Sequence, residues 1–566
     1  MNDGKHHDWP RKVERPAFAA LWAFLLAPVI AQGMWRPLLH IFGPSGRAAA
    51  ITGSALAVSG TIVVIQTLRA GKAPFFSLAL AGAVAIGASV GLSLGLPGLL
   101  TLFIVAATLA FLWQPLSARL PTALDGLAKR HKLLFALYVA LALAAVVKTA
   151  QLSVFIGDSA RVDQQAVPGQ KFLETHSCLT AYVHADALSR QRVDNLYAER
   201  FWLGSHGFPP APAGVESPYR PFDLDYYAYP PPFLLVMAPL AALSGDFAAQ
   251  RALWFGCNGL LLAVGLWIVA RWLSGPGAHR VLLLAPIFFG SLPVLATLQV
   301  GNFQIAVVMI SVLAMVAFER DRPALGGALL AFAILSKLSP GVLGIVLLAQ
   351  RRFRGAAWTA GFGVVFLALS ILTIGVNPMK SFLTYMLSRL SSGEAFAFMD
   401  DAPFSILTNM SPFGLPFKLQ LIGFDVSDPW VMARRIGRIY SGILAILTVV
   451  AVRRTGDRRS QAMLWMSLLV LAALQSPFAP GYVTIGLLWA ITLWTVEVRR
   501  LRGGISLVLL WLLITIVPPI PNLHIFAVYS VLQSALTLGV SVWLVVRGAR
   551  LPGLPTLATH PPERIS

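Results

Sequence analysis

The sequence predicts an all-α polytopic membrane protein, and its composition and its apolar runs are the observations that predict it. Of the 566 residues, 57% are hydrophobic and 12% are charged, and the mean hydropathy is +0.72. These values are too apolar for a soluble multidomain protein. Apolar runs long enough to cross about 30 Å of hydrocarbon recur along the whole chain. Helices are the expected spanning element because each helix satisfies its own backbone hydrogen bonds inside the membrane.

The apolar runs predict roughly 13–16 spans. The first four belong to residues 1–132, which we expect to form an N-terminal cytoplasmic segment and four extra helices beside a core at 133–566. Residues 231–244 are apolar but too few to cross the membrane, which favours an interfacial or re-entrant helix. The expected spans lie near 17–34, 48–67, 75–95, 97–115, 133–156, 250–271, 280–299, 302–318, 324–350 (a broken pair), 355–377, 433–452, 462–476, 482–496, 504–519 and 524–546.

The net charge of +20 is unevenly distributed. Two long polar stretches, 157–230 and 378–432, hold 14 acidic and 9 basic residues, which leaves 10 acids and 35 bases elsewhere. Many of these bases lie in short connectors such as "QRRFRG" (350–355) and "VEVRRLRG" (496–503). Basic connectors mark the cytoplasmic side of a membrane protein. We therefore expect both polar stretches to be external loops, both termini to be cytoplasmic, and no nucleic-acid partner.

Motifs for nucleotide or zinc chemistry are absent from the sequence. It contains no Walker-type phosphate loop, no H-E-x-x-H and no C-x-x-C, so ATP-driven transport and zinc hydrolysis lose support. The doublet Asp400 and Asp401 is read as solvated. Cys178 and Cys257 lie in a loop and in an apolar run, and no disulfide is expected between them. No cofactor and no metal site is predicted, although a divalent metal ion is left open.

Asp158 follows the fifth expected span directly, at the outer membrane surface. A carboxylate there faces water on one side and hydrocarbon on the other, and partial desolvation would make it a better base. The C-terminal end of a helix disfavours an anion, which argues for a role other than helix stability. The alternative is an ordinary solvated aspartate at a helix end. Asp163, five residues later, is the second candidate base.

Lys337, in "FAILSKLSPGVLG", lies between two apolar half-segments and near Pro340, which breaks the helix. A lysine at bilayer depth costs roughly 2.5–3.5 kcal/mol on insertion scales, so such residues often line a cavity or meet an anion. The alternative is a lysine that reaches to the interface from a helix end. Arg220, in the first polar stretch, is a second cation that could meet a phosphate.

Polar and aromatic side chains suited to saccharides occur in three further places. Amide groups lie at an expected outer turn in "LQVGNFQIAV", although the "GN" pair could be turn chemistry alone. The cluster "DLDYYAYPPP" mixes carboxylates and rings, although tyrosines at an interface are often belt residues. The histidine of "ETHSCLTAY" is a surface residue or a partner for the base. The candidate sugar- or acceptor-binding residues are His176, Tyr182, Asp225, Tyr226, Tyr229, Asn302 and Gln304.

The order of these features resembles a known family. An apolar helix ending in aspartate precedes "TAYVHADALSRQRVDNLY", followed by "YAYPPPFLLVMAPLAAL", "LQVGNFQIAVVMISVLAM", "SKLSPGVLGIVLLAQRRFRGA" and "LQSPFAPGYV". From about residue 150 to 500 this resembles the bacterial GT-C glycosyltransferases that depend on polyprenyl-phosphate hexoses and include α-mannosyltransferases. The resemblance implies a GT-C-type helix bundle with a large external first catalytic loop, in the bacterial cytoplasmic membrane.

The resemblance also implies a reaction. Such enzymes pass one hexose, mannose-like here, from a polyprenyl-phosphate sugar to an acceptor hydroxyl of a lipid or glycan, with inversion and with an aspartate as general base. Carried over by position, the base is Asp158 or Asp163, and a cation such as Lys337 or Arg220 would meet the donor phosphate. Many relatives place the aspartate nearer to the tyrosine that matches Tyr182, where this chain has serine and cysteine. They also carry lysine–proline and glycine–glutamine pairs where this chain has "SKLSP" and "GNFQ".

Two other functions share the same features. A transporter or flippase of a lipid-linked saccharide would need a site at the membrane midplane, yet charges within the apolar runs are sparse and no inverted repeat is visible. A polysaccharide polymerase or ligase would share the large external loop but would transfer a polymer. The partners expected in the leading interpretation are a polyprenyl-phosphate sugar, a lipid or glycan acceptor, and membrane lipids.

Overall fold

The computed structural model describes residues 132–205, 217–243, 245–273, 275–400, 402–452, 458–497, 501–516 and 520–550, together with eight positions between 21 and 33. Within these ranges every regular element is a helix, and no strand occurs. The all-α fold class is therefore confirmed. The spans expected at 48–67, 75–95 and 97–115 lie outside the described residues, so the expected division at residue 132 stays a prediction.

The chain divides into two compact units. The first contains residues 1–227 and 234–309, and the second contains 228–233 and 310–566. The short segment 228–233 thus belongs to the second unit although both of its neighbours in sequence belong to the first. We describe each unit by itself.

The first unit is built around α10 (Phe247–Leu273), which packs against four other helices. Gly290 follows α11 where that helix meets α6, and a Cβ atom at this position would come within 2.3 Å of the Cβ of Ala145. Close approach of the two helices therefore requires glycine there. The other helices of this unit are α6 (Lys132–Gly157), α7 (Lys171–Thr175), α8 (Cys178–Arg190), α9 (Leu234–Leu243), α11 (Gly275–Phe289), α12 (Leu292–Val300) and the first part of α13 (Gln304–Glu319).

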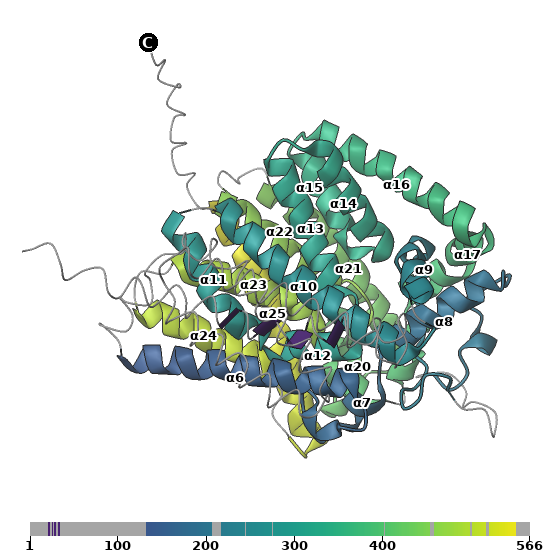
Figure 1. Ribbon diagram of the computed structural model, residues 1–566, viewed down its shortest axis with the longest axis horizontal. Coiled ribbons are helices and arrows are strands. Elements are labelled where there is room, and N and C mark those ends of the chain that lie inside the picture. Colours follow the sequence, from purple (N-terminus) through teal and green to yellow (C-terminus); the bar gives the residue numbers. More distant parts are fainter. Residues whose placement is uncertain are drawn as a thin grey trace, which may run out of the picture. The chain divides into compact units, whose positions relative to one another are not determined.

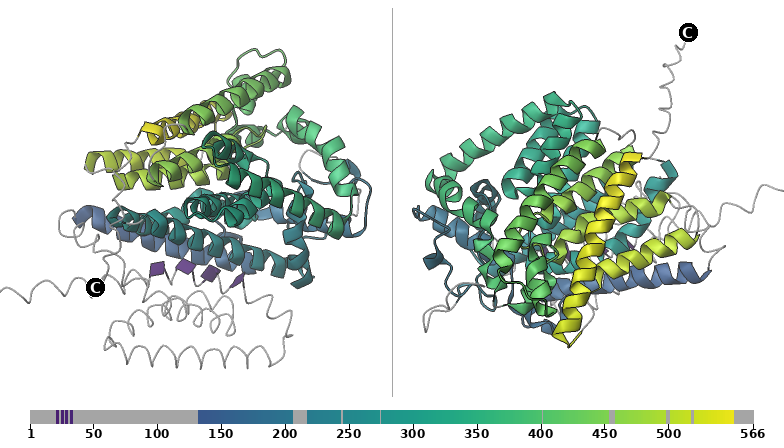
Figure 2. Two further views of the ribbon diagram at one scale, coloured as in Figure 1. Left: turned by 90° about the horizontal axis from the view of Figure 1, so that it is seen from above. Right: turned by 180° about the vertical axis from the view of Figure 1, so that it is seen from behind.

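The second unit packs α14 (Pro323–Ser336) against α16 (Phe353–Ile374), beside α15 (Val342–Ala349) (Figure 1). Figure 2 shows α25 (Leu523–Arg550), in yellow, against the green helices α21 (Pro429–Val452) and α22 (Arg458–Ala473). The remaining helices are α17 (Asn377–Ser381), α18 (Leu387–Ser392), α19 (Pro403–Thr408), α20 (Leu415–Leu421), α23 (Ile485–Glu497) and α24 (Leu501–Thr515), with short segments η3 (Pro231–Phe233), η4 (Ser339–Gly341), η5 (Phe382–Met386), η6 (Glu394–Met399), η7 (Pro412–Gly414) and η8 (Gly481–Thr484).

Helices occur at every expected span within the described part of the chain, but many are short. Five are long and apolar enough to cross a membrane, or six if the bent pair of α12 and α13 is one span. Others, such as Ser460–Ala473 and Gly481–Trp494, have 10–17 residues, fewer than the roughly 20 that a crossing needs. Within the described residues, helix length therefore supports fewer crossings than the spans expected there. The segment at 231–244 is a short apolar helix, Pro231–Leu243, as its length predicted.

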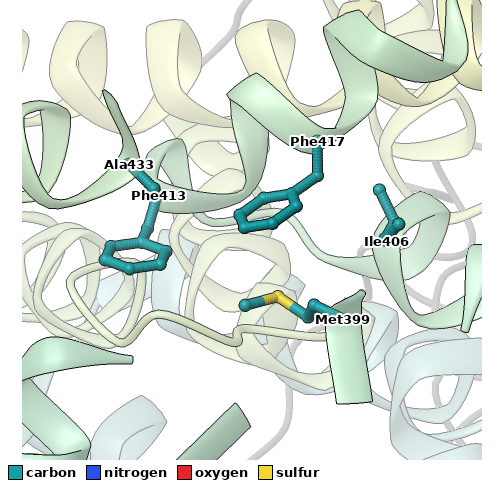
Figure 3. Close-up of a cluster of buried hydrophobic side chains, with 5 residues drawn as sticks. All are labelled: Met399, Ile406, Phe413, Phe417 and Ala433. Carbon is teal, nitrogen blue, oxygen red and sulfur yellow. The ribbon is translucent and has the colours of Figure 1, made fainter. Parts of the chain in front are cut away.

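The second polar stretch folds onto an apolar cluster of its own. Figure 3 shows the buried side chains of this cluster, which come from η6, α19, η7, α20 and α21. Phe396, Phe398 and Trp430 pack around it. A stretch that reads as a polar loop therefore carries a hydrophobic core, which holds its short helices in place. The buried members are Met399, Ile406, Phe413, Phe417 and Ala433.

Candidate functional site

Asp158 lies directly after α6, whose final residues are held by a buried arginine. Arg251, in α10, donates from Nη1 to the backbone oxygens of Phe155 and Ile156, both at 3.3 Å. Its guanidinium also lies 4.4 Å from the centre of the Phe222 ring and is 3% exposed. A cation at this position offsets the partial negative charge at the C-terminal end of α6. The helix end beside Asp158 is thus stabilised by the chain itself.

The Asp158 side chain is exposed. Its Oδ1 accepts a hydrogen bond from the backbone N–H of Ala160 at 3.1 Å, which is an ordinary turn contact after a helix end. The partial desolvation expected for this carboxylate is therefore wrong for the structure described here. An aspartate side chain is one of the groups that can take a proton from an acceptor hydroxyl. Its role as a base stays a prediction.

Asp163, the second candidate base, is engaged with its neighbours. It accepts a hydrogen bond from the Gln164 amide, and Arg161 Nε lies 3.4 Å from its Oδ1. The Gln164 hydrogen bond and the adjacent Arg161 guanidinium lower the pKa of Asp163. A lower pKa makes a weaker base. Which of the two aspartates acts as the base stays a prediction.

The loop region comprises residues 158–205 and 217–227 of the first polar stretch, and α8 is its longest helix. This helix spans Cys178–Arg190 and buries nine of its residues. His184 contacts Tyr219 Oη at 3.2 Å through Nδ1 and the backbone oxygen of Phe201 at 3.1 Å through Nε2. Burial lowers the pKa of His184. A neutral histidine therefore joins three parts of the loop region.

Three candidate metal-ligating side chains converge beside the start of α8. His176 Nε2 lies 3.5 Å from Cys178 Sγ and 3.9 Å from Asp225 Oδ2. All three donor atoms lie within 4.8 Å of one another. The two segments that carry them are joined by the backbone hydrogen bond from Asp223 N to Thr175 O, at 2.8 Å. The sequence predicted His176 and Asp225 as sugar- or acceptor-binding residues and predicted no metal site, and it gave Cys178 no role.

The amide turn after α12 contacts the same cluster. Asn302 Nδ2 donates to Cys178 Sγ at 3.4 Å, and Asn302 Oδ1 accepts from the backbone N–H of Gln304 at 3.0 Å. Gly301 has φ +71°, and the chain bends by 111° between α12 and α13. Asn302 and Gln304 are both 2% exposed. The expected turn is present, but these amides serve protein contacts, and direct contact with a sugar is not supported.

Tyr182 is also buried in this unit. Its side chain is 0% exposed, its hydroxyl accepts from the backbone N–H of Phe303 at 3.4 Å, and its ring packs against Trp254. The expected sugar contact is therefore not supported for Tyr182, because its ring is part of the core. The residue instead joins α8 to the start of α13.

Tyr226 and Arg220 are more accessible. Tyr226 is half-buried, and its hydroxyl donates to the backbone oxygen of Tyr197 at 3.1 Å. Its ring packs edge-on against Trp202. Arg220 is exposed. Both residues can meet a ligand at the surface of the loop region, and their expected roles stay predictions.

Lys337 lies in the second unit, at the break that the sequence predicted. It follows α14 with extended backbone angles, φ −155° and ψ 119°, and η4 begins two residues later. The ammonium lies 5.7 Å from the centre of the Tyr229 ring and 5.1 Å from that of Tyr482. Ring faces attract a cation without using its hydrogen-bond donors. The ammonium of Lys337 thus lies within cation–π distance of two tyrosine rings.

The turn that carries Tyr482 is held by the second polar stretch. Asn409 Nδ2 donates to the backbone oxygen of Pro477 at 2.8 Å, and Asn409 Oδ1 accepts from the backbone N–H of Ala479 at 2.9 Å. Ser411 Oγ donates to the backbone oxygen of Leu474 at 2.9 Å. Asn409 is fully buried. The "SPFAPGY" turn therefore has a fixed conformation that presents Tyr482 to Lys337.

Comparison with known proteins gives one match. Residues 227–478 match the model of glycosyltransferase family 87, which is less than half of the chain. The matched range includes Tyr229 and Lys337 but ends before Tyr482. No curated protein and no solved structure matches the chain. Together with the long apolar helices, the family match supports a multi-pass membrane glycosyltransferase.

Proposed function

We propose that the protein transfers one hexose from a polyprenyl-phosphate sugar to a hydroxyl of a lipid or glycan acceptor outside the cytoplasm. The observation that carries this proposal is the position of the Lys337 ammonium near the rings of Tyr229 and Tyr482. Tyr229 and Lys337 both lie inside the range that matches a glycosyltransferase family. A cation combined with aromatic faces suits a ligand that has both a phosphate and a sugar. The mannose-like identity of the hexose rests on the family resemblance alone.

The proposed reaction is an inverting displacement. The acceptor oxygen attacks the anomeric carbon while its proton passes to a carboxylate, for which we propose Asp158. The bond from the anomeric carbon to the phosphate oxygen breaks, and polyprenyl phosphate leaves with the electron pair. A cation would stabilise the negative charge that develops on this leaving group, and we propose Lys337 for this role independently of the choice of base. Phosphate is a good leaving group, so the chemistry needs no nucleotide.

Substitution of the two loop aspartates tests the assignment of the base. We expect Asp158→Asn to keep folding and donor binding but to lose at least about a hundredfold in kcat, the usual scale of general-base catalysis. The matched control is Asp194→Asn, which changes an exposed carboxylate of the same loop region. This variant should retain transfer. The assay uses purified protein, a lipid-linked hexose and an acceptor lipid fraction. Full activity of Asp158→Asn combined with loss in Asp163→Asn would reverse the assignment.

A further inference from the structure

Two side chains face the same nitrogen of His176. Cys178 Sγ lies 3.5 Å from Nε2, and Asp225 Oδ2 lies 3.9 Å from the same atom. One ring nitrogen carries at most one proton and can donate to one acceptor. A cysteine, a histidine and a carboxylate that converge in this way are the ligand types that hold zinc.

We propose that His176, Cys178 and Asp225 bind a divalent metal ion of the zinc class. In tetrahedral coordination, Zn–S and Zn–N lengths of about 2.3 and 2.0–2.1 Å place sulfur and nitrogen about 3.5 Å apart. The observed separation of 3.5 Å between Sγ and Nε2 already fits. The nitrogen and oxygen ligands would lie about 3.4 Å apart, so the observed 3.9 Å needs a closure of roughly half an ångström.

Neighbouring groups orient each of the three ligands. The His176 ring stacks on Phe172, with centroids 4.4 Å apart. Asp225 Oδ1 accepts from the backbone N–H of Tyr226 at 2.9 Å, which leaves Oδ2 directed toward the histidine. Cys178 is the first residue of α8, where the helix dipole favours a thiolate. Such outer contacts are typical of metal centres because they fix the geometry of the ligands.

The charge and the accessibility of the cluster also suit a zinc-class ion. A thiolate and a carboxylate together balance the two positive charges of the ion, and the histidine binds as the neutral form. Cys178 is 7% exposed, whereas the side chains of His176 and Asp225 are 19% and 24% exposed. A fourth coordination position is therefore accessible from one side. Three protein ligands and one open position are the pattern of zinc sites that bind water or substrate.

The metal site is independent of the proposed transfer reaction. It uses residues that the sequence suggested as sugar contacts, and a bound ion would replace those direct contacts of His176 and Asp225. The ion would also cross-link the start of α8 to the segment that carries Asp225, which are 47 residues apart in the sequence. Binding can be measured without any sugar. Failure of either proposal therefore leaves the other intact.

Cobalt titration tests the site directly, because a thiolate bound to Co²⁺ gives a charge-transfer absorption in the near ultraviolet. The full chain is purified with a tag that contains no histidine, stripped with a chelator, dialysed and titrated with Co²⁺ and then Zn²⁺. We expect one equivalent of Co²⁺ to produce the band and Zn²⁺ to remove it. Cys178→Ser should abolish the band, and Cys257→Ser, at the only other cysteine, should keep it. Absence of the band in the unmodified protein, or its survival in Cys178→Ser, overturns the proposal.

A second measurement avoids any change at Cys178. In the Cys257→Ser protein, Cys178 is the single thiol, so its alkylation rate reports its state alone. Bound Zn²⁺ should slow this reaction at least about tenfold, and Asp225→Asn should weaken Zn²⁺ binding by at least about tenfold, since even outer contacts of metal sites are worth this much. Equal alkylation rates with and without Zn²⁺ in the Cys257→Ser protein would overturn the proposal.

Discussion

Replacement of Lys337 by methionine is the sharpest test of the proposed phosphate contact. Methionine keeps the apolar stem and removes the charge. A unit charge about 4 Å from a phosphate charge is worth about 4 kcal/mol at an effective dielectric constant of about 20. Lys337 is only half-buried, so solvent screening reduces this to about 2–3 kcal/mol. The expected loss in kcat/KM for the donor is therefore about 30- to 150-fold.

Two companion variants separate charge from packing. Lys337→Arg keeps a cation and should recover part of the activity. Tyr482→Phe keeps the ring face 5.1 Å from the ammonium and should change kcat/KM little, whereas Tyr482→Leu removes a contact worth about 0.5–2 kcal/mol. The assay follows transfer of labelled hexose from a polyprenyl-phosphate donor by purified protein of checked thermal stability. A Lys337→Met protein within threefold of the parent would refute the phosphate contact.

Three further variants test the scaffold by thermal unfolding of the solubilised protein. Arg251→Met should cost about 3 kcal/mol, because two backbone oxygens at the end of α6 lose a charged donor; a loss under 1 kcal/mol would contradict this. Burial lowers the pKa of Lys418 to about 7, so between about pH 7 and 10.5 the unfolded chain binds more protons than the folded chain and stability rises with pH. Lys418→Met should flatten this rise, and an identical pH profile would count against it. Gly301→Ala should cost about 1–2 kcal/mol, because φ is +71° and the new Cβ would lie 3.3 Å from Trp254; unchanged stability would contradict this.

Local patterns in the sequence predicted local features of the fold. Apolar runs predicted the positions of the helices, and Pro340 predicted the break at which Lys337 lies. The glycine before Asn302 predicted the turn between α12 and α13, which its positive φ confirms. Each of these features depends on residues close together in the sequence. The number of crossings could not be obtained in this way, because composition does not fix where a helix ends.

The site required contacts that no local pattern encodes. Cys178 and Asp225 meet because the segments around Thr175 and Asp223 are joined by a backbone hydrogen bond, and the residues between them show no periodicity that would predict it. Tyr182 was predicted as a sugar- or acceptor-binding residue but packs in the core. The sequence did contain a sign that Tyr182 is buried. Residues three apart share one helix face, so Tyr182 lies on the same face of α8 as the apolar Leu179. Asp158 was placed correctly at a helix end, but its exposure depends on tertiary packing.

The most direct test of the proposed function compares lipid and glycan fractions from cells with and without the protein by mass spectrometry. Hexose transfer predicts a product that is heavier by one hexose only in cells that contain the protein, and loss of that product in cells that carry Asp158→Asn. Unchanged masses, together with a shift of lipid-linked saccharide from one leaflet to the other, would contradict transfer and indicate transport instead.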